Sequence, residues 1–599
     1  MDYGAIRNLP TMFFDQAARF SDRPFLSAKQ DGEWQSLTWA ETAERVSALS
    51  RGLRALGIGP GDRVALVSEN RPEWLIADVA IMATGALTVP AYTTNSEEDH
   101  LFVLCDSAAK GIVVSTAALA KRALRAAQKC PQTEFAICME QPDDVPGQGL
   151  HTLLWDETLD KGRNTPDDVR ERAAKPARGD TCCLIYTSGT GGRPKGVMLS
   201  HGAIICNCMG AQEVISRLPG YQEPGEVFLS FLPLSHAYEH TAGQFFPMSI
   251  GAEICYAESL DRLVANIGEV RPTIMTAVPR LYESIYGRIL RGLNDAPPLR
   301  QKLFHKAVEL GRKRYENPAS LTLGERALDR ILDLLVRSKI SARFGGRLKA
   351  FVSGGAALNY DIGLFFVALG VRLLQGYGQT EAAPVICVNR HDLVKIDTVG
   401  PPLKGVEVRL AEDGEILVRG ELLMNGYWNR PEDTAQTIRD GWLHTGDIGE
   451  FDADNYLRIT DRKKDIIVNS GGDNISPQRI EGMLTTEAEI AQAMVHGDKR
   501  PHLVALIVPD ADFARTWATG HDRSADLASL LKDPDFVRVI GAAVDRVNAR
   551  VSVVERVRRF VLSSEPFTID NGMMTPSMKI RRHIIREKHG ASLDALYKN

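Results

Sequence analysis

Short apolar runs alternate with amphipathic stretches over roughly the first 400 residues of the chain, and this alternation limits the fold more than any other feature. The runs typical of strands are residues 63–68, 111–115, 183–186, 273–278 and 349–353. Helical stretches such as residues 39–56 lie between them. The pattern predicts an α/β fold with a doubly wound sheet, in which ligands bind beyond the C-terminal ends of the strands.

After about residue 400 the pattern changes to β-hairpins. Residues 406–410 and 416–419 flank a polar turn, and a second hairpin joins residues 448–451 to 456–459. The predicted domains are an N-terminal domain of residues 1–463, with a β-rich sub-domain at about 400–460, and a small C-terminal α+β domain of residues 464–599.

Residues 285–346 are rich in Arg, Lys and Leu and predict a helical insertion. Between residues 327 and 336, apolar side chains recur at helical spacing, with charged side chains on the other face. The apolar set is Leu328, Ile331, Leu332 and Leu335, and the charged set is Asp329, Arg330 and Asp333. We expect the apolar stripe to pack on the main body; the alternative is a helix lying on a membrane surface.

Composition argues against several classes of protein. With 71 Lys and Arg against 76 Asp and Glu, no global positive field favours nucleic acid. The longest charge-free run, residues 79–96, contains Gly85 and Pro90, which argues against a transmembrane helix. No signal-peptide pattern opens the sequence, and the nine Cys form no C-x-x-C pair. We expect a cytoplasmic protein with reduced core thiols, Cys182 and Cys183 among them, in preference to a metal or redox site.

A loop rich in Gly, Thr and Ser follows the strand that ends at Tyr186 and is closed by Lys195. Its residues include Thr187, Ser188, Gly189, Thr190 and Gly191. Glycines let backbone N–H groups approach phosphate oxygens, hydroxyls add donors, and the lysine adds a positive charge. The loop is not a Walker A motif, because Gly196 follows the lysine where that motif has Ser or Thr. The composition favours phosphate binding over a flexible surface turn.

Two later strand ends carry polar or small residues. Residues 354–357 offer exposed backbone, and residues 373–381 bring Tyr377, Thr380 and Glu381 close together in the sequence. An aromatic face suits a purine, a threonine hydroxyl suits a phosphate, and a carboxylate suits Mg²⁺. Each residue alone would more often be structural, but the three strand-end loops together predict one nucleotide site.

Three further segments are ambiguous on their own. Asp447, in a tight turn, suits either the two hydroxyls of a ribose or the stabilisation of the turn itself. The basic run Arg462–Lys464 and the lysine at 579, after a Pro-containing turn, would each pass for ordinary surface charge.

Taken in order, these motifs resemble the adenylate-forming superfamily of acyl-CoA synthetases, luciferases and peptide-synthetase adenylation domains. The matching segments are residues 186–195, 376–381, 445–447, 461–465, 471–477 and the region of Lys579. The resemblance runs from about residue 20 to about residue 585. Residues 231–240 and 278–283, together with the helical insertion, are similar to bacterial long-chain fatty acyl-CoA synthetases.

The resemblance implies a two-step reaction that uses ATP, Mg²⁺ and coenzyme A. A fatty acid carboxylate attacks the α-phosphate of ATP, giving acyl-adenylate and pyrophosphate, and the thiol of coenzyme A then displaces AMP. The alternatives are an acyl-AMP ligase that loads a carrier protein, an aryl- or short-acid CoA ligase, and a catalytically silent lipid- or nucleotide-binding protein.

The resemblance also implies a role for each matching residue. The loop Thr187–Lys195 holds the β- and γ-phosphates, and Thr187 and Glu381 place Mg²⁺. The nucleotide set further includes Gly355, Ala356, Gln375, Gly376, Tyr377 and Gly378 around the adenine, Thr380 at the α-phosphate, and Asp447 and Arg462 at the ribose. Lys579 bridges the carboxylate and the phosphate in the transition state, so Lys579, Thr380 and Glu381 are the expected catalytic residues.

The C-terminal domain is expected to rotate between the two steps. Lys464 would be the hinge, and Gly471 and Gly472 would line the pantetheine path after rotation. His236 suits the entrance of the acyl pocket, with a structural histidine as the alternative. A homodimer and peripheral contact with the inner face of the membrane complete the expectations.

Overall fold

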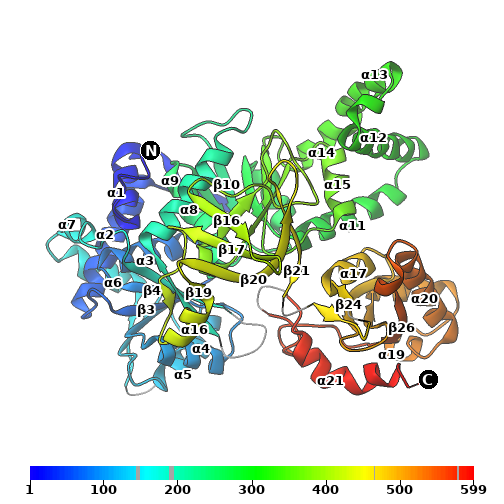
Figure 1. The fold of residues 1–599 in the computed structure, drawn as a ribbon. Helices are drawn as coiled ribbons and strands as arrows, with labels where there is room; N and C mark the ends of the chain where they lie inside the picture. Colours follow the sequence, from blue (N-terminus) through cyan, green and yellow to red (C-terminus); the bar gives the residue numbers. More distant parts are fainter. Residues whose placement is uncertain (144–148, 188–193, 464–465, 472, 576–578, 599) are drawn as a thin grey trace.

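Two eight-stranded sheets form the centre of the N-terminal part in the computed structural model (Figure 1), which describes all residues except 144–148, 188–193, 464–465, 472, 576–578 and 599. The first sheet has the order β15 (Val385–Val388), β14 (Leu373–Gly378), β13 (Ala350–Ser353), β12 (Ile274–Ala277), β10 (Val227–Ser230), β11 (Glu253–Tyr256), β1 (Pro24–Gln30) and β2 (Glu33–Thr38). The second has the order β18 (Gly426–Tyr427), β9 (Lys195–Ser200), β8 (Thr181–Thr187), β4 (Leu87–Pro90), β3 (Arg63–Val67), β5 (Gly111–Val114), β6 (Phe135–Cys138) and β7 (His151–Leu154). Central pairs such as β12–β13 and β3–β5 are parallel, so the predicted α/β class is confirmed.

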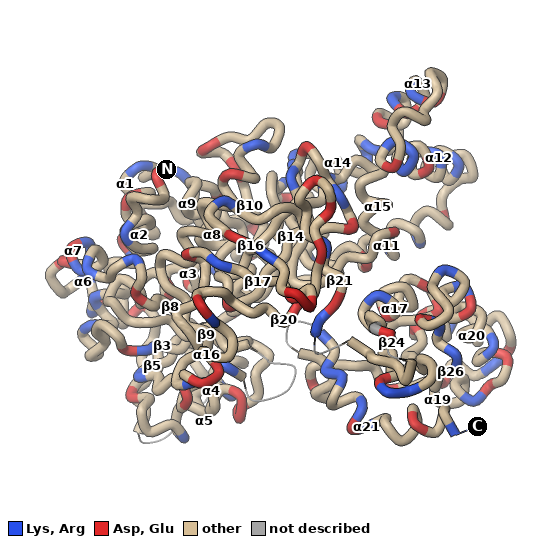
Figure 2. The backbone as a smooth tube through the Cα atoms, viewed as in Figure 1, with Lys and Arg blue, Asp and Glu red and all other residues tan. Residues whose placement is uncertain are grey.

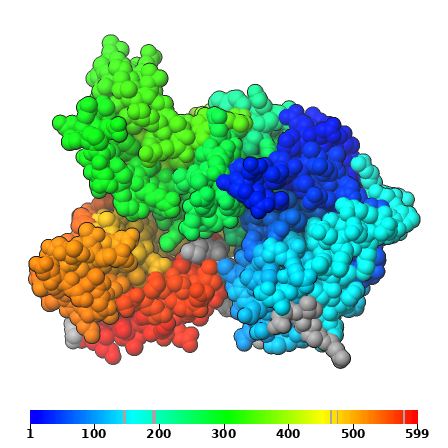
Figure 3. All heavy atoms as spheres, turned by 180° about the vertical axis from the view of Figure 1, so that it is seen from behind, coloured from blue at the N-terminus to red at the C-terminus, as the bar shows by residue number. Residues whose placement is uncertain are grey.

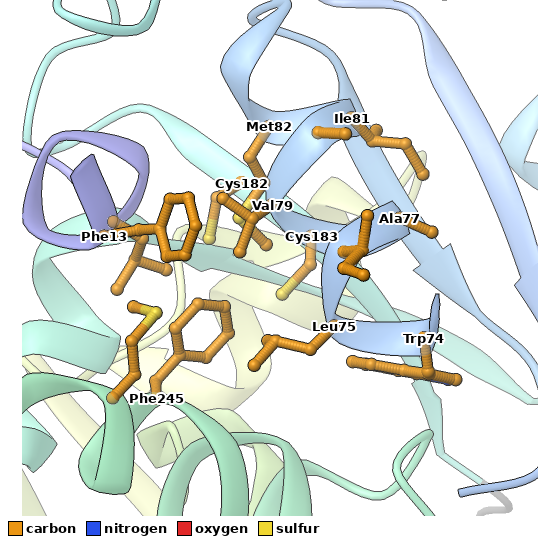
Figure 4. Packing of buried hydrophobic residues seen from close by; sticks show 14 of the residues in the cluster. Phe13, Trp74, Leu75, Ala77, Val79, Ile81, Met82, Cys182, Cys183 and Phe245 are labelled. Carbon is orange, nitrogen blue, oxygen red and sulfur yellow. The ribbon is translucent and has the colours of Figure 1, made fainter. Parts of the chain in front are cut away.

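The largest apolar core includes helices α1 (Leu9–Phe20) and α3 (Pro72–Ala83) (Figure 4). All but one of the twelve residues of α3 are buried. A helix that is apolar on all sides needs such an environment. The charge-free run 79–96 thus supplies the end of a core helix and the strand β4, and none of the helices in the described part of the chain is long and apolar enough to cross a membrane.

Both predicted hairpins are present in a five-stranded sheet. Its strands are β16 (Val406–Leu410), β17 (Glu415–Gly420), β20 (Trp442–Phe451), β19 (Ile438–Arg439) and β21 (Leu457–Arg462). Strands β20 and β21 pair antiparallel, with Asp447 opposite Arg462. The pairing brings two predicted site residues side by side at one end of the hairpin.

The C-terminal part has its own sheet and core. Strands β24 (Ile490–His496), β25 (Leu503–Pro509) and β26 (Val557–Leu562) form the sheet, with helices α17 (Pro477–Leu484), α20 (Pro534–Asn548) and α21 (Arg582–Ala595). Its two apolar clusters contain no residue before Ile467. The predicted α+β character is confirmed, and the boundary at residues 463/464 stays a prediction.

The insertion is helical, but the predicted apolar stripe is only partly buried: Leu328 and Leu332 pack in a small apolar cluster with Ala307 and Leu310, away from the main body, and the other two members are exposed. It comprises α11 (Pro279–Asn294), α12 (Pro298–Glu316), η2 (Pro318–Ser320), α13 (Leu323–Leu332), the π-helical turn η3 (Asp333–Arg337) and α14 (Ser338–Arg343). Leu332 is buried, whereas Ile331 is 51% and Leu335 46% exposed. Asp329, expected on the polar face, is buried because Arg314 and Arg337 neutralise its carboxylate at 2.8 and 2.7 Å.

Candidate active site

A cavity of about 740 Å³ is lined by residues of the first sheet, the five-stranded sheet and the C-terminal part. Figure 1 shows where these three parts of the chain lie. Strand β14 and the short helix η4 (Thr380–Ala382) contribute one wall, and β20 and β21 contribute another. Thr575 and Lys579 come from the C-terminal part. The cavity therefore lies at the C-terminal end of a strand of the first sheet, where ligands of α/β proteins are expected.

The structure gathers most of the predicted residues around this one cavity. Those that line it are Thr187, Lys195, His236, Gly355, Gly376, Tyr377, Gly378, Thr380, Glu381, Asp447, Arg462 and Lys579. Ser188, Gly189, Thr190, Gly191, Lys464 and Gly472 lie outside the described residues. Sequence positions nearly 400 residues apart thus meet at one site.

Three predicted residues do not line the cavity. The side-chain amide of Gln375 is buried and donates a hydrogen bond to the backbone oxygen of Ile396, so it ties down a neighbouring loop. Ala356 is exposed, beside rather than in the cavity wall. The backbone N–H of Gly471 donates to the Asn469 side chain at 2.8 Å within the C-terminal part.

The carboxylate of Asp447 is buried at the cavity wall and held by two neighbouring side chains. The residue is 5% exposed; the Tyr377 hydroxyl donates to its Oδ2 at 2.6 Å, and Arg462 Nε lies 3.2 Å from its Oδ1. The turn before it needs glycine, because Gly446 has a φ of +70°. Burial and the Asp447 charge raise the pKa of Tyr377 well above its usual value, so this hydroxyl stays protonated and keeps donating. Each oxygen of the carboxylate keeps acceptor capacity for a ligand hydroxyl.

Glu381 and Thr187 offer oxygen ligands on the cavity wall. The Tyr427 hydroxyl donates to Glu381 Oε1 at 2.8 Å, which orients the carboxylate. Mg²⁺ binds through one or two carboxylates plus phosphate oxygens, so this pair fits a magnesium ion that arrives with a nucleotide.

Tyr427 and Asp433 also contact Lys195, and the sequence analysis missed both. Lys195 Nζ lies 3.1 Å from Asp433 Oδ2 and 4.9 Å from the centre of the Tyr427 ring. The two residues flank the start of α16 (Pro431–Thr437), about 240 positions beyond the lysine. No local motif marks them, because their role depends on β18 pairing with β9.

His236 is neutral and lies near Lys579. Its Nδ1 accepts the backbone N–H of Tyr238 at 3.2 Å, which leaves the ring proton on Nε2. Burial and the positive charge of Lys579 lower the pKa of His236 to about 4. Lys579 itself closes a turn with Thr575, since each backbone N–H is held by an oxygen of the other residue, at 3.1 and 2.8 Å.

Cations slightly outnumber anions on the described cavity wall. The cations are Lys195, Arg439, Arg462, Lys463 and Lys579, and the anions are Glu381, Glu415, Asp433 and Asp447. Several positive groups that converge on one cavity are suited to hold a polyanion such as a triphosphate.

Comparison with known proteins supports the resemblance drawn from the sequence. The family model described as AMP-binding enzyme matches residues 13–428, and that described as AMP-binding enzyme C-terminal domain matches residues 464–599. The chain is 34% identical to the long-chain-fatty-acid–CoA ligase FadD15 of Mycobacterium tuberculosis, over 98% of this chain and 97% of that protein. It is 30% identical to the peroxisomal long chain acyl-CoA synthetase 6 of Arabidopsis thaliana, over 95% of this chain and 82% of that protein.

Solved structures share the fold. The adenylation domain of the carboxylate reductase of Mycobacterium chelonae has a TM-score of 0.75 at 22% identity, covering 99% of this chain and 91% of that one. The A domain of the carboxylic acid reductase of Segniliparus rugosus, solved with AMP and a co-purified carboxylic acid, has a TM-score of 0.76 at 21% identity, covering 99% and 94%. The predicted resemblance is confirmed, and the chain belongs to the AMP-binding enzyme family.

Proposed function

We propose that this protein is a long-chain fatty acyl-CoA synthetase, which activates a fatty acid with ATP and transfers the acyl group to coenzyme A. The observation that carries the proposal is the meeting of Lys579, from the C-terminal part, with Thr380, Glu381 and Asp447 at one cavity. The relatives named for long-chain acyl-CoA synthesis, similar over nearly the whole chain, support the choice of acid and acceptor.

The first step joins two anions, a carboxylate and a triphosphate, so catalysis depends on cancelling charge and fixing geometry. The Asp447 carboxylate accepts hydrogen bonds from the ribose hydroxyls, and the Tyr377 ring packs against the adenine. Lys195 and the neighbouring loop hold the terminal phosphates. Glu381 and Thr187 would hold Mg²⁺, and the ion would supply neutralisation of phosphate charge there.

Lys579 and Thr380 act on the reacting atoms themselves. The Lys579 ammonium spans the acyl carboxylate and the α-phosphate, where negative charge builds up, and the Thr380 hydroxyl donates to the α-phosphate. Because His236 is neutral, its Nε2–H donates a hydrogen bond to the acyl carboxylate and adds no second positive charge beside Lys579. No protein nucleophile is needed.

The second step requires Lys579 to leave and the thiol of coenzyme A to approach. We infer that the C-terminal part turns about Lys464 and brings Gly471 and Gly472 to the pantetheine path. The anchoring of the flanking residues supports this pivot. Lys463 donates its backbone N–H to Gly446 O and its ammonium to Glu415, whereas Ile467 already belongs to the C-terminal core.

The direct test is a panel of fatty acids from short to long chains, assayed with magnesium-ATP and coenzyme A for pyrophosphate and acyl-CoA. We expect acyl-CoA with long-chain acids. Acylation of a phosphopantetheinylated carrier protein instead of coenzyme A would indicate an acyl-AMP ligase. Turnover of aryl or short acids alone would indicate an aryl- or short-acid CoA ligase. Folded protein that releases no pyrophosphate with any acid would refute the proposal.

The low pKa of His236 gives a pH test. Because the ring stays neutral above about pH 5, replacing it should change kcat/KM for the fatty acid by the same factor at every pH between about 5.5 and 8. The measurement is the ratio of kcat/KM between the wild type and His236→Gln across that range. A ratio that drifts tenfold around the ordinary histidine pKa would show that the ring titrates and that a neutral donor is the wrong description.

A further inference from the structure

The segment of residues 298–347, called the arm below, combines exposed leucines with unpaired positive charge. It contains α12, α13, η3 and α14 and projects from the body of the molecule, as seen from both sides (Figures 1 and 3). We propose that the arm is a docking surface for an anionic phospholipid membrane. This inference does not depend on which acid the enzyme activates.

The inner side of the arm is well anchored. Ala307 and Leu310 of α12 form a small apolar cluster with Leu321 and Leu332. At Gly311, α12 lies so close to α15 (Tyr360–Ala368) that an added Cβ would be 2.2 Å from a backbone oxygen. This packing holds the outer surface of the arm in a fixed position relative to α15.

The outer side exposes apolar side chains at an unusual density. Leu323 is 85%, Leu334 76% and Leu299 68% exposed, in addition to Ile331 and Leu335. These five are among thirteen large apolar residues exposed in the described part of the chain, although the arm is only a twelfth of its length. Isolated exposed leucines are common, but a cluster of them marks an interaction surface.

The net positive charge of the arm favours an anionic partner. It has twelve Lys and Arg against five Asp and Glu, whereas acidic residues exceed basic ones in the whole chain. The acidic groups Glu325, Asp329 and Asp333 are already held by Lys313, Arg314 and Arg337. Figure 2 shows Lys and Arg positions along α12, α13 and α14 in blue.

Several exposed basic residues have no ion pair among the described side chains: Arg300, Lys302, Arg326, Arg330, Lys339, Arg343 and Arg347. On α13, Arg326 and Arg330 are one helical turn apart and flank the exposed apolar positions Leu323, Ile331 and Leu334. Leucines bordered by Lys and Arg on one helical surface are typical of helices that lie in the interface of an anionic bilayer. A protein partner with an apolar surface would not need this excess of unpaired cations.

The experiment is sedimentation of the full-length protein with vesicles, either phosphatidylcholine alone or phosphatidylcholine with phosphatidylglycerol. We expect the wild type to bind the anionic vesicles at least tenfold more tightly, and the binding to weaken as salt is raised. Leu323→Ser with Leu334→Ser should lower this binding at least tenfold by removing inserted side chains. Arg326→Glu with Arg330→Glu should lower it at least as much and should reduce its dependence on salt.

The matched control variants make the same kinds of substitution at positions outside the arm. Leu260→Ser with Val553→Ser removes two exposed apolar residues, 67% and 61% exposed. Lys121→Glu with Arg125→Glu reverses two exposed charges one helical turn apart on α5 (Ala117–Gln128). Both controls should bind vesicles like the wild type, and all variants should keep the circular dichroism and pyrophosphate release of the wild type on dispersed substrate.

The proposal is overturned if the wild type does not sediment with anionic vesicles, or if the arm variants bind them as well as the controls do. It is also overturned if the wild type is a dimer that the leucine variant dissociates while vesicle binding is unchanged, since the occupant of the surface would then be a second copy of the chain.

Discussion

Replacing Lys579 with alanine is expected to slow adenylate formation by roughly 10²–10³-fold, the scale for removing one charge contact made in a transition state. Lys579 lines the cavity together with His236, Thr380 and Glu381. In the proposed mechanism its ammonium would meet the charge that develops only as the two anions combine. The measurement is the rate of pyrophosphate release at saturating ATP and fatty acid. Thioester formation from separately prepared acyl-adenylate and coenzyme A should stay within a few-fold of the wild type.

Two variants make this result specific. Lys588→Ala removes a lysine of α21 that pairs with Glu565, outside the cavity wall, and should leave both half-reactions unchanged. Lys579→Arg keeps the positive charge but not the compact ammonium, and should recover only part of the rate. An equal loss in both half-reactions for Lys579→Ala would contradict a role confined to adenylation.

A proline at position 464 is expected to have the opposite effect on the two half-reactions. The ring fixes φ at the proposed pivot, so the C-terminal part could reach the adenylation arrangement but not the one needed for thioester formation. Adenylation should stay within a few-fold of the wild type, and transfer to coenzyme A should fall by at least about tenfold, the loss expected when a required domain motion is blocked. Single-turnover assays of each half-reaction separate the two effects.

The matched control is Lys464→Ala, which removes the side chain and leaves the backbone free to rotate. It should support both half-reactions at near wild-type rates. If the proline variant turned over coenzyme A as fast as the alanine variant, the pivot would lie elsewhere.

Much of the fold could be predicted from the sequence because local patterns and long-range pairing agree. The runs at 63–68 and 349–353 become β3 and β13 to within one residue, and the turn at 412–414 joins β16 to β17. The strand-end loops could be combined into one site because the C-terminal ends of neighbouring parallel strands share an edge of the sheet. Their gathering around one cavity is observed; the role of each residue stays a prediction.

Other features depend on tertiary contacts that no local pattern contains. Gln375 lies in a strand, as predicted, yet its side chain points to Ile396 rather than into the cavity. Successive side chains of a strand point to opposite faces of the sheet, and the sequence does not indicate which face lines the ligand site. Asp433 meets Lys195 only because two distant strands pair. Asp329 sits at a polar position of its helix and is nevertheless buried, because two arginines from elsewhere in the arm neutralise it.

The separation of the apolar clusters at Ile467 has a consequence for heat denaturation. Two bodies that share no core can melt independently, so a calorimetric scan of the free protein need not show a single cooperative transition. The cavity is lined by residues of both bodies, so a nucleotide bound there in the proposed way would stabilise the state in which both are native. Added ATP should therefore make the two thermal transitions merge into one. Calorimetry would then report how strongly ATP couples the unfolding of the two bodies.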